Sequence, residues 1–199
     1  ADSLERNLTS LYRKYITGLM AMDSGRIFYP DANFTMRIAY GKAEGYKSRD
    51  AVSYTSSTTL DGVMEKEDPN NWEFVVPAKL KELYKAKDYG QYADADGSLH
   101  VCFTSDNDIT GGNSGSPVIN ANGELFGLAF DGNWEAMNGD IAFENKLQKT
   151  INVDIRYVLF IIDKYAGAKR LIDEMDIVSQ RITPAQTLLD QKEITQPVN

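Results

Sequence analysis

The sequence predicts a mainly β fold with helices at its two ends. In several short segments apolar and polar residues alternate with a period of two, or strand-forming residues cluster between turn signals. These expected strands are residues 34–40, 53–58, 99–103, 118–120, 124–130 and 149–154. The pair 118–120 and 124–130 is joined by Asn122-Gly123, a dipeptide that favours a tight β-hairpin.

Helical segments complete the pattern. Residues 3–22 place apolar side chains at i, i+4 and i+7 spacing, with Ser3 as candidate N-cap, and predict an amphipathic helix. Residues 77–87 are expected to form a short helix with Pro77 near its first position, where proline is favoured. Towards the C-terminus an apolar helix is predicted at 155–165 and a further helical stretch at 168–175.

The composition indicates a globular chain that neither binds nucleic acid nor spans a membrane. Its 199 residues are 42% hydrophobic and 25% charged, enough for one sizeable core with extensions. With 21 basic against 29 acidic residues, the net charge of −8 repels phosphate backbones, so we expect no nucleic-acid partner. The longest apolar candidate, residues 157–162, is far shorter than a membrane span. The single cysteine, Cys102, excludes an internal disulfide and is interpreted as a buried strand residue.

The run TGGNSGSPVI, residues 110–119, is the strongest functional signal in the chain. It places the hydroxyl of Ser114 in a glycine-rich turn that leads into an apolar strand, as a serine nucleophile is presented. Glycines without a Cβ let the backbone turn tightly, so that the amides of Gly112 and Ser114 can form an oxyanion hole. The alternative reading of this run is an ordinary glycine-rich hairpin loop.

Residues 112–117, GNSGSP, resemble the G-[DN]-S-G-[GS]-P signature around the nucleophile of chymotrypsin-like serine peptidases. With the segments 107–109, 123–144 and 153–175 included, the chain is similar to the C-terminal part of the bacterial dipeptidyl-peptidase 7 and 11 family. These are serine exopeptidases that release dipeptides from peptide N-termini. The likeness covers residues 28–175, whereas the tail beyond Val178 resembles nothing in that family.

The resemblance implies a chymotrypsin-like fold, of which this chain carries the second β-barrel with closing helices. Residues 1–24 would be the end of the inserted helical domain, 25–178 the barrel domain, and 179–199 an unassigned tail. In such enzymes the histidine base and the aspartate that orients it come from the first barrel, long before the serine. Because 113 residues precede Ser114, we expect the chain to be a C-terminal piece of a longer enzyme, inactive by itself.

The sole histidine, His100, tests this expectation. It lies in the strand LHVCF, 14 positions before Ser114. A base must approach the hydroxyl to within about 2.6–3.2 Å, which a strand that feeds the same loop could do only by folding back. We therefore interpret His100 as a structural strand residue, with a catalytic base as the alternative.

Asp131 and Gly132 are the expected substrate-binding residues. By resemblance, Asp131 binds the α-ammonium of the substrate, and Gly132 lies at the base of the pocket for the residue before the cut bond. A carboxylate makes a charge-assisted hydrogen bond to an ammonium, whereas an internal amide offers no charge. Relatives that prefer Asp or Glu carry an arginine where this chain has Gly132, so we expect an apolar preference and the dipeptidyl-peptidase 7 type. Without the resemblance, Asp131-Gly132 would be an ordinary turn dipeptide.

Zymogen activation of the trypsin type requires an aspartate just before the serine, but this chain has the neutral Asn113 there. We therefore expect a site that is assembled without cleavage. We also expect no cofactor and no metal. Residues 94–98 could be mistaken for a calcium loop, but Leu99 and Ser105 stand where an EF-hand needs glycine and glutamate, so a turn is predicted.

The predicted function is therefore that of a serine dipeptidyl-peptidase, acting on peptides with a free N-terminus. The expected partner is the remainder of the same enzyme, with its upstream barrel and helical domain, and a homodimer is left open. Two alternatives stay open: a noncatalytic peptide-binding module and a glutamyl or trypsin-like endopeptidase. By resemblance, the location would be the periplasm or cell envelope of a Gram-negative bacterium.

Overall fold

A computed structural model of the protein describes residues 2–26, 28, 35–139 and 143–179. The chain divides into two units, Ala1–Arg37 and Ile38–Asn199. The first unit contains the helix α1 (Asp2–Met22), which confirms the amphipathic helix expected at 3–22. Large apolar side chains on this helix are exposed: Leu4, Leu8, Leu11, Tyr12, Tyr15 and Met20. No helix in the described residues is long and apolar enough to cross a membrane.

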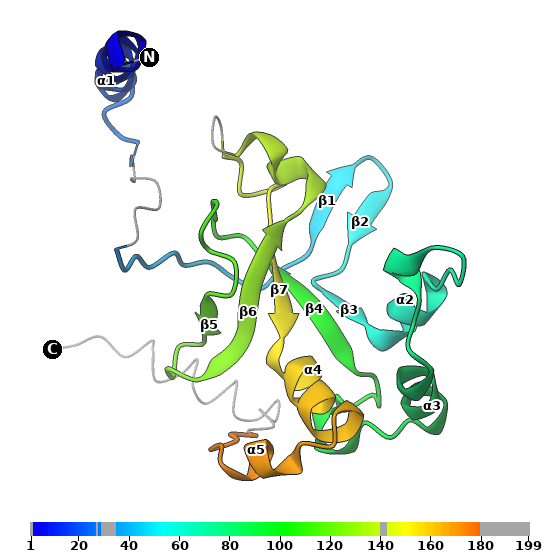
Figure 1. Ribbon diagram of the computed structural model, residues 1–199. Coiled ribbons are helices and arrows are strands. Elements are labelled where there is room, and N and C mark those ends of the chain that lie inside the picture. The colour runs from blue at the N-terminus through cyan, green and yellow to red at the C-terminus, as the bar shows by residue number, and fades with distance from the viewer. Residues whose placement is uncertain (1, 27, 29–34, 140–142, 180–199) are drawn as a thin grey trace, which may run out of the picture. The chain divides into compact units, whose positions relative to one another are not determined.

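The second unit is built on an antiparallel sheet of five strands (Figure 1). In spatial order they are β3 (Ser57–Thr59), β4 (His100–Ser105), β7 (Thr150–Asp154), β6 (Leu125–Gly132) and β5 (Pro117–Ile119). A separate hairpin pairs β1 (Tyr46–Arg49) with β2 (Val52–Tyr54). Among the described residues β3 and β5 are edge strands of this sheet, which therefore stays open, whereas the family resemblance implied a β-barrel.

Most of the predicted strands are confirmed, but the strand predicted at residues 34–40 is wrong. Residues 35–40 form no strand, and Phe34 lies outside the described residues. The side chains of Met36, Ile38 and Tyr40 are exposed, because alternation specifies a strand only where a neighbouring strand completes the hydrogen bonds.

The strand expected at 53–58 is interrupted. It divides into β2 and β3, because β2 pairs back onto β1 whereas β3 pairs with β4. At the junction Thr55 Oγ1 donates a hydrogen bond to the Ser57 carbonyl oxygen at 3.0 Å. The junction therefore satisfies one of its polar groups locally, outside the sheet.

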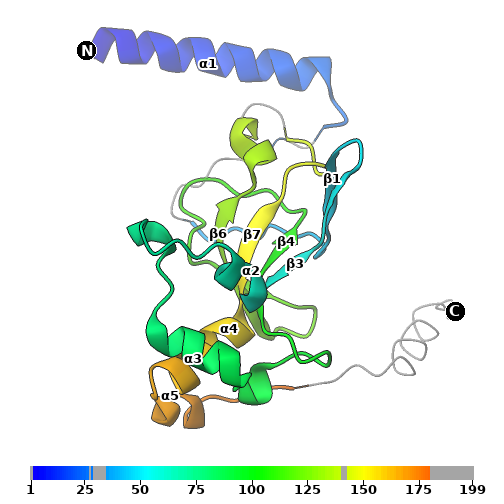
Figure 2. The same cartoon turned by 90° about the vertical axis from the view of Figure 1, so that its right-hand side faces the viewer.

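Helices gather at one end of the sheet and enclose the core. Figures 1 and 2 show α3 (Ala78–Ala86), α4 (Ile155–Phe160) and α5 (Lys169–Asp173) near the point where β7 ends. The helix α2 (Leu60–Glu65) follows β3 directly. The buried apolar cluster is Leu60, Val76, Leu80, Tyr89, Tyr92, Leu99 and Phe160. The sheet is thereby anchored at this end by a packed core.

The remaining elements are short. Three 3₁₀ turns are η1 (Trp72–Phe74), η2 (Gly90–Tyr92) and η3 (Trp134–Asn138). The helix expected at 155–165 begins as α4, with Asp154 as its N-cap, and continues as the π-helix η4 (Ile161–Tyr165). Pro77 is the N-cap of α3, as its position in the sequence indicated.

Candidate functional site

The glycine-rich turn before β5 is held by its own backbone. Gly112 has φ of 100° and Gly115 has φ of 82°, conformations that favour glycine because other residues would strain there. Asn113 closes the turn from both sides: its backbone N–H donates to the Thr110 carbonyl at 3.2 Å, and its Oδ1 accepts from the Thr110 N–H at 3.0 Å. Ser114 follows directly, and it is exposed to solvent.

Hydrogen bonds tie this turn to β6. The Gly115 N–H donates to the Ala129 carbonyl at 2.7 Å, and the Ala129 N–H donates to the Ser116 carbonyl at 2.9 Å. The Ser114 hydroxyl lies 3.5 Å from the Phe130 carbonyl oxygen, to which it donates a long hydrogen bond. Ser114 is therefore held beside the end of β6.

The amides around Ser114 are available to a ligand. Within the described part of the chain, neither the Gly112 nor the Ser114 N–H donates to another backbone group. Two N–H groups without a backbone partner, beside an exposed hydroxyl, are the kind of donors that an oxyanion would require. The turn can therefore present a nucleophile and anion-binding donors together.

Asp131 and Gly132 close β6 just after a β-bulge. Ala129 pairs with Asn152 and Asp131 with Ile151, so Phe130 is the extra residue on β6. Bulges re-aim side chains and are frequent beside active sites. Asp131 is exposed, and its Oδ1 accepts a hydrogen bond from the Gly132 N–H at 2.8 Å. The structure thus brings Ser114 to the residue immediately before the predicted ammonium-binding carboxylate.

A buried asparagine that the sequence reasoning missed supports this end of β6. Asn133 follows Gly132, and its Nδ2 donates to the Leu147 carbonyl at 2.8 Å and to Glu135 Oε2 at 2.9 Å. Its Oδ1 accepts from the Lys149 N–H at 2.8 Å, and its own N–H donates to the Lys149 carbonyl at 3.0 Å. The side chain therefore joins the end of β6 to the segment before β7.

The Lys149 side chain is fully buried beneath the same region. Its Nζ makes an ion pair with Glu44 Oε1 at 2.7 Å and donates to the Asn145 carbonyl. Nearby, the Tyr46 hydroxyl donates to Glu135 Oε2 at 3.1 Å, and burial, with a contribution from Glu135, raises the pKa of this phenol. No local sequence signal marks the Lys149–Glu44 and Tyr46–Glu135 contacts, because the two partners of each are distant in the chain.

A second polar network holds the start of the loop that leads to Ser114. The Asn152 Nδ2 donates to Ser105 Oγ at 2.9 Å, and this hydroxyl donates to Asn107 Oδ1 at 2.6 Å. The Asn107 Nδ2 donates to Thr150 Oγ1 at 3.2 Å, and the Thr150 hydroxyl donates back to the Asn107 carbonyl at 2.7 Å. Residues 105–107, which begin the loop that leads to Ser114, are thereby fixed to β7.

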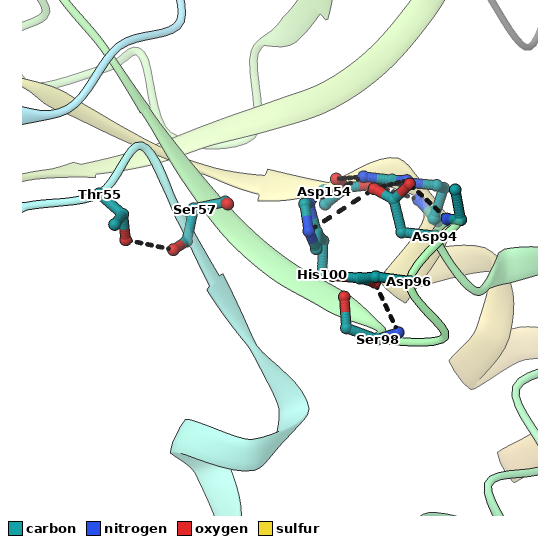
Figure 3. A network of polar contacts seen from close by, with 9 residues as sticks. Thr55, Ser57, Asp94, Asp96, Ser98, His100 and Asp154 are labelled. Atoms are coloured by element: carbon teal, nitrogen blue, oxygen red, sulfur yellow. Dashed lines mark hydrogen bonds and ion pairs between the residues drawn. The ribbon is translucent and has the colours of Figure 1, made fainter.

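His100 lies in a different polar cluster, which Figure 3 shows together with Asp94 and Asp154. An Arg156 guanidinium nitrogen is 3.0 Å from His100 Nδ1, and His100 Nε2 is 3.6 Å from Asp94 Oδ2. A guanidinium can only donate, so Nδ1 accepts and the ring proton is on Nε2, towards Asp94. Cys102, two residues after His100, pairs with Val153, whereas Gly132 pairs with Thr150. His100 therefore lies towards the opposite end of β7 from Gly132 and from the neighbouring Ser114.

The cluster around His100 is an ion-pair network. Arg156 binds Asp154 through two hydrogen bonds, of 3.0 and 2.8 Å, and Asp94 at 3.0 Å. These carboxylates raise the pKa of Arg156, Asp154 most of all. The pKa of Asp94 is lowered, first by the Ala95 N–H and then by Arg156. The geometry supports a structural role for His100.

The turn expected at 94–98 is confirmed, because the Asp94 N–H donates to the Ser98 carbonyl at 2.8 Å. Cys102 is half-buried, and burial raises the pKa of its thiol. In the described ranges no three His, Cys, Asp or Glu side chains are grouped to hold a metal ion.

Comparison with known proteins connects this site to peptidases. The family model described as Peptidase S46 matches residues 1–177. The chain is 62% identical over 178 residues to Dipeptidyl-peptidase 7 of Phocaeicola vulgatus, covering 89% of this chain and 24% of that protein. It is 58% identical over 166 residues to the Asp/Glu-specific dipeptidyl-peptidase of Porphyromonas gingivalis, covering 83% of this chain and 23% of that protein.

A solved structure agrees with these matches. The crystal structure of Porphyromonas endodontalis DPP11 in complex with substrate is similar with a TM-score of 0.75 at 56% identity. The similarity covers 81% of this chain and 24% of that one. The chain thus spans about a quarter of the length of the curated relatives it matches. The family match over residues 1–177, together with these identities, shows that the chain belongs to the peptidase S46 family.

Proposed function

We propose that this chain is the nucleophile-bearing C-terminal part of a serine exopeptidase that releases dipeptides from peptide N-termini. The observation that carries the proposal is the contact between the Ser114 hydroxyl and the Phe130 carbonyl, one residue before Asp131. This contact supports an arrangement in which Ser114 attacks the peptide while Asp131 binds the α-ammonium of the same short substrate. Relatives named as dipeptidyl-peptidases, among them one that is 62% identical, support it.

Catalysis would proceed through an acyl-enzyme on Ser114. The Ser114 oxygen gives its proton to a base and bonds to the scissile carbonyl carbon, while the Gly112 and Ser114 amides hold the oxyanion. The C–N bond then breaks, and the amine leaves with the proton. Water, deprotonated by the same base, then attacks the ester; the bond to Ser114 breaks, the base returns the proton to the Ser114 oxygen, and the dipeptide is freed. The base and its orienting aspartate would come from an upstream barrel, which would complete a chymotrypsin-like fold with the sheet of this chain.

Asp131 would make the enzyme an exopeptidase. Its exposed carboxylate can accept charge-assisted hydrogen bonds from the α-ammonium of the substrate, which an internal amide cannot offer. Gly132 would form the floor of an uncharged pocket, where burial of an apolar side chain contributes about 1.5–3 kcal/mol. An acidic side chain there would be desolvated without a partner, at a cost of several kcal/mol. We therefore propose an apolar penultimate residue. The proposed periplasmic or envelope location rests on the family resemblance alone.

The role of Ser114 is tested in the full-length enzyme. Ser114→Ala should abolish both dipeptide release and labelling by a fluorophosphonate, whereas Ser53→Ala, on the exposed hairpin strand β2, should change neither. Undiminished labelling of the Ser114→Ala enzyme would refute the assignment. A wild-type protein that binds peptides without labelling or turnover would instead support the noncatalytic module.

Exopeptidase character and specificity need separate substrates. Free and N-acetylated forms of one peptide test Asp131, because acetylation removes the ammonium. The wild type should cleave only the free form, and Asp131→Asn should lower kcat/KM for that form by about tenfold or more. Equal cleavage of both forms would favour the endopeptidase alternative. Paired dipeptidyl substrates that differ only in Leu or Glu at the penultimate residue test Gly132, and faster cleavage of the Glu substrate would contradict its place in the pocket.

A further inference from the structure

We infer that Ala136 is a second specificity-determining residue, because its methyl group limits which side chain position 132 can carry. This inference rests on the proposed function and concerns the same pocket. A Cβ added at Gly132 would lie 3.1 Å from the Ala136 Cβ, closer than ordinary van der Waals contact. Ala136, four positions after Gly132 and on η3, would therefore restrict any side chain introduced at position 132.

The backbone at Gly132 does not itself exclude a side chain. Gly132 is the last residue of β6 and pairs with Thr150, so its conformation is that of a strand. If the Ala136 methyl group is taken away, the nearest remaining atom to an added Cβ is the Lys149 carbonyl oxygen at 3.9 Å. That distance is an ordinary contact, so Ala136 alone causes the crowding.

Ala136 cannot easily move aside, because η3 is anchored on both sides of it. The Ala136 N–H donates to the Asn133 carbonyl at 2.9 Å, and its carbonyl accepts from the Gly139 N–H at 2.9 Å. The side chain of Asn138 accepts from Gln148 Nε2 at 2.9 Å, and that of Glu135 accepts from the Tyr46 hydroxyl and from Asn133. A shift of η3 by a few tenths of an ångström would disturb this whole set.

This crowding affects any attempt to change the preferred penultimate residue of the substrate from apolar to acidic. A cation at position 132 would supply the partner for an acidic penultimate residue, but in this chain its stem must push against Ala136. Gly132→Arg alone should therefore switch specificity incompletely. Ala136→Gly should complete the switch, because it removes the one atom in the way.

The test is a double-mutant cycle in the full-length enzyme with two readouts. The melting temperature is measured for wild type, Gly132→Ala, Ala136→Gly and the double variant. Gly132→Ala should lower it, and Ala136→Gly should restore part of that loss, although glycine destabilises η3 in the wild type. Ala86→Gly, at the exposed end of α3, is the control and should add independently to Gly132→Ala.

The second readout is the ratio of kcat/KM for the Glu substrate to that for the Leu substrate. Ala136→Gly should raise this ratio about tenfold more in the Gly132→Arg background than in the wild type, since overpacking has effects of this size. Additive melting temperatures and an unchanged ratio would overturn the inference. If the wild type released no dipeptides, the proposed function and the claim about specificity would both be refuted. The melting temperatures would still show whether a side chain at position 132 contacts the Ala136 methyl group. If Gly132→Arg did not fold, Gly132→Lys would take its place in the same assay, because it also supplies a cation, and the same two results would support or overturn the inference.

Discussion

The buried ion pair between Lys149 and Glu44 should respond very differently to the loss of its two partners. The Lys149 side chain is 0% exposed, whereas that of Glu44 is 45% exposed. Glu44→Ala leaves the ammonium buried with the Asn145 carbonyl as its remaining partner. Breaking a buried pair in this way costs about 3–5 kcal/mol, and we expect about 3 kcal/mol because water can enter the half-open Glu44 side.

Replacing the other partner, Lys149, should reduce the stability only slightly. Lys149→Met keeps most of the volume and removes the charge that had to be desolvated, and the half-exposed Glu44 carboxylate can be rehydrated. We expect a loss of about 1 kcal/mol or less. The double variant should be close to Lys149→Met, since the uncompensated charge is then absent.

Urea-dependent proteolysis of the full-length enzyme can measure the three variants, because cleavage reports on the population of the opened domain. Asp173→Ala is the control, since it breaks a pair with Lys169 in which both side chains are mostly exposed, and it should change nothing measurable. The reasoning fails if Lys149→Met destabilises the domain as much as Glu44→Ala, because burial of the charge would then not decide the cost.

Two further predictions concern the nucleophile turn and the His100 cluster. Asn113→Asp keeps the acceptor for the Thr110 N–H and should retain activity without any proteolysis, whereas Asn113→Ala should lose about tenfold in kcat. Activity that appears only after a new, buried N-terminus is created would contradict this. The pKa of Asp94 is lowered from 3.8 by the Ala95 N–H and by Arg156, so its contribution to stability is present above that value and lost as pH falls through the lower, folded-state pKa. Asp94→Asn should therefore flatten the acid end of the stability profile measured by urea unfolding between about pH 5 and pH 2.

Local features of the chain were predictable from the sequence. The helix α1 follows from the spacing of its leucines and tyrosines, and the β5–β6 hairpin follows from Asn122-Gly123, where Gly123 has φ of 84°. The turn around Ser114, with Gly112 and Gly115 at positive φ, was also predictable from the local sequence. These features depend on residues a few positions apart, so propensity and glycine placement carry the information.

The supports of the candidate site could not be predicted in that way. Lys149 contacts Glu44 across 105 positions, and Tyr46 contacts Glu135 across 89. The family resemblance implies a place for Gly132 at the base of the pocket, but nothing in the sequence indicates that the Ala136 Cβ would lie 3.1 Å from a Cβ added there. Such distances are set by how η3 docks against its neighbours.

The same limit explains the elements that differ from expectation. Residues 35–40 alternate like a strand yet form none, and the sheet has open edges at β3 and β5 within the described residues. The sequence by itself determined the helices, the hairpin and the turn that exposes Ser114, because these are decided by short-range sterics and hydrogen bonds. Only the tertiary structure decided which strands pair, which charge is buried and which methyl group borders Gly132, because each depends on partners brought together from distant parts of the chain.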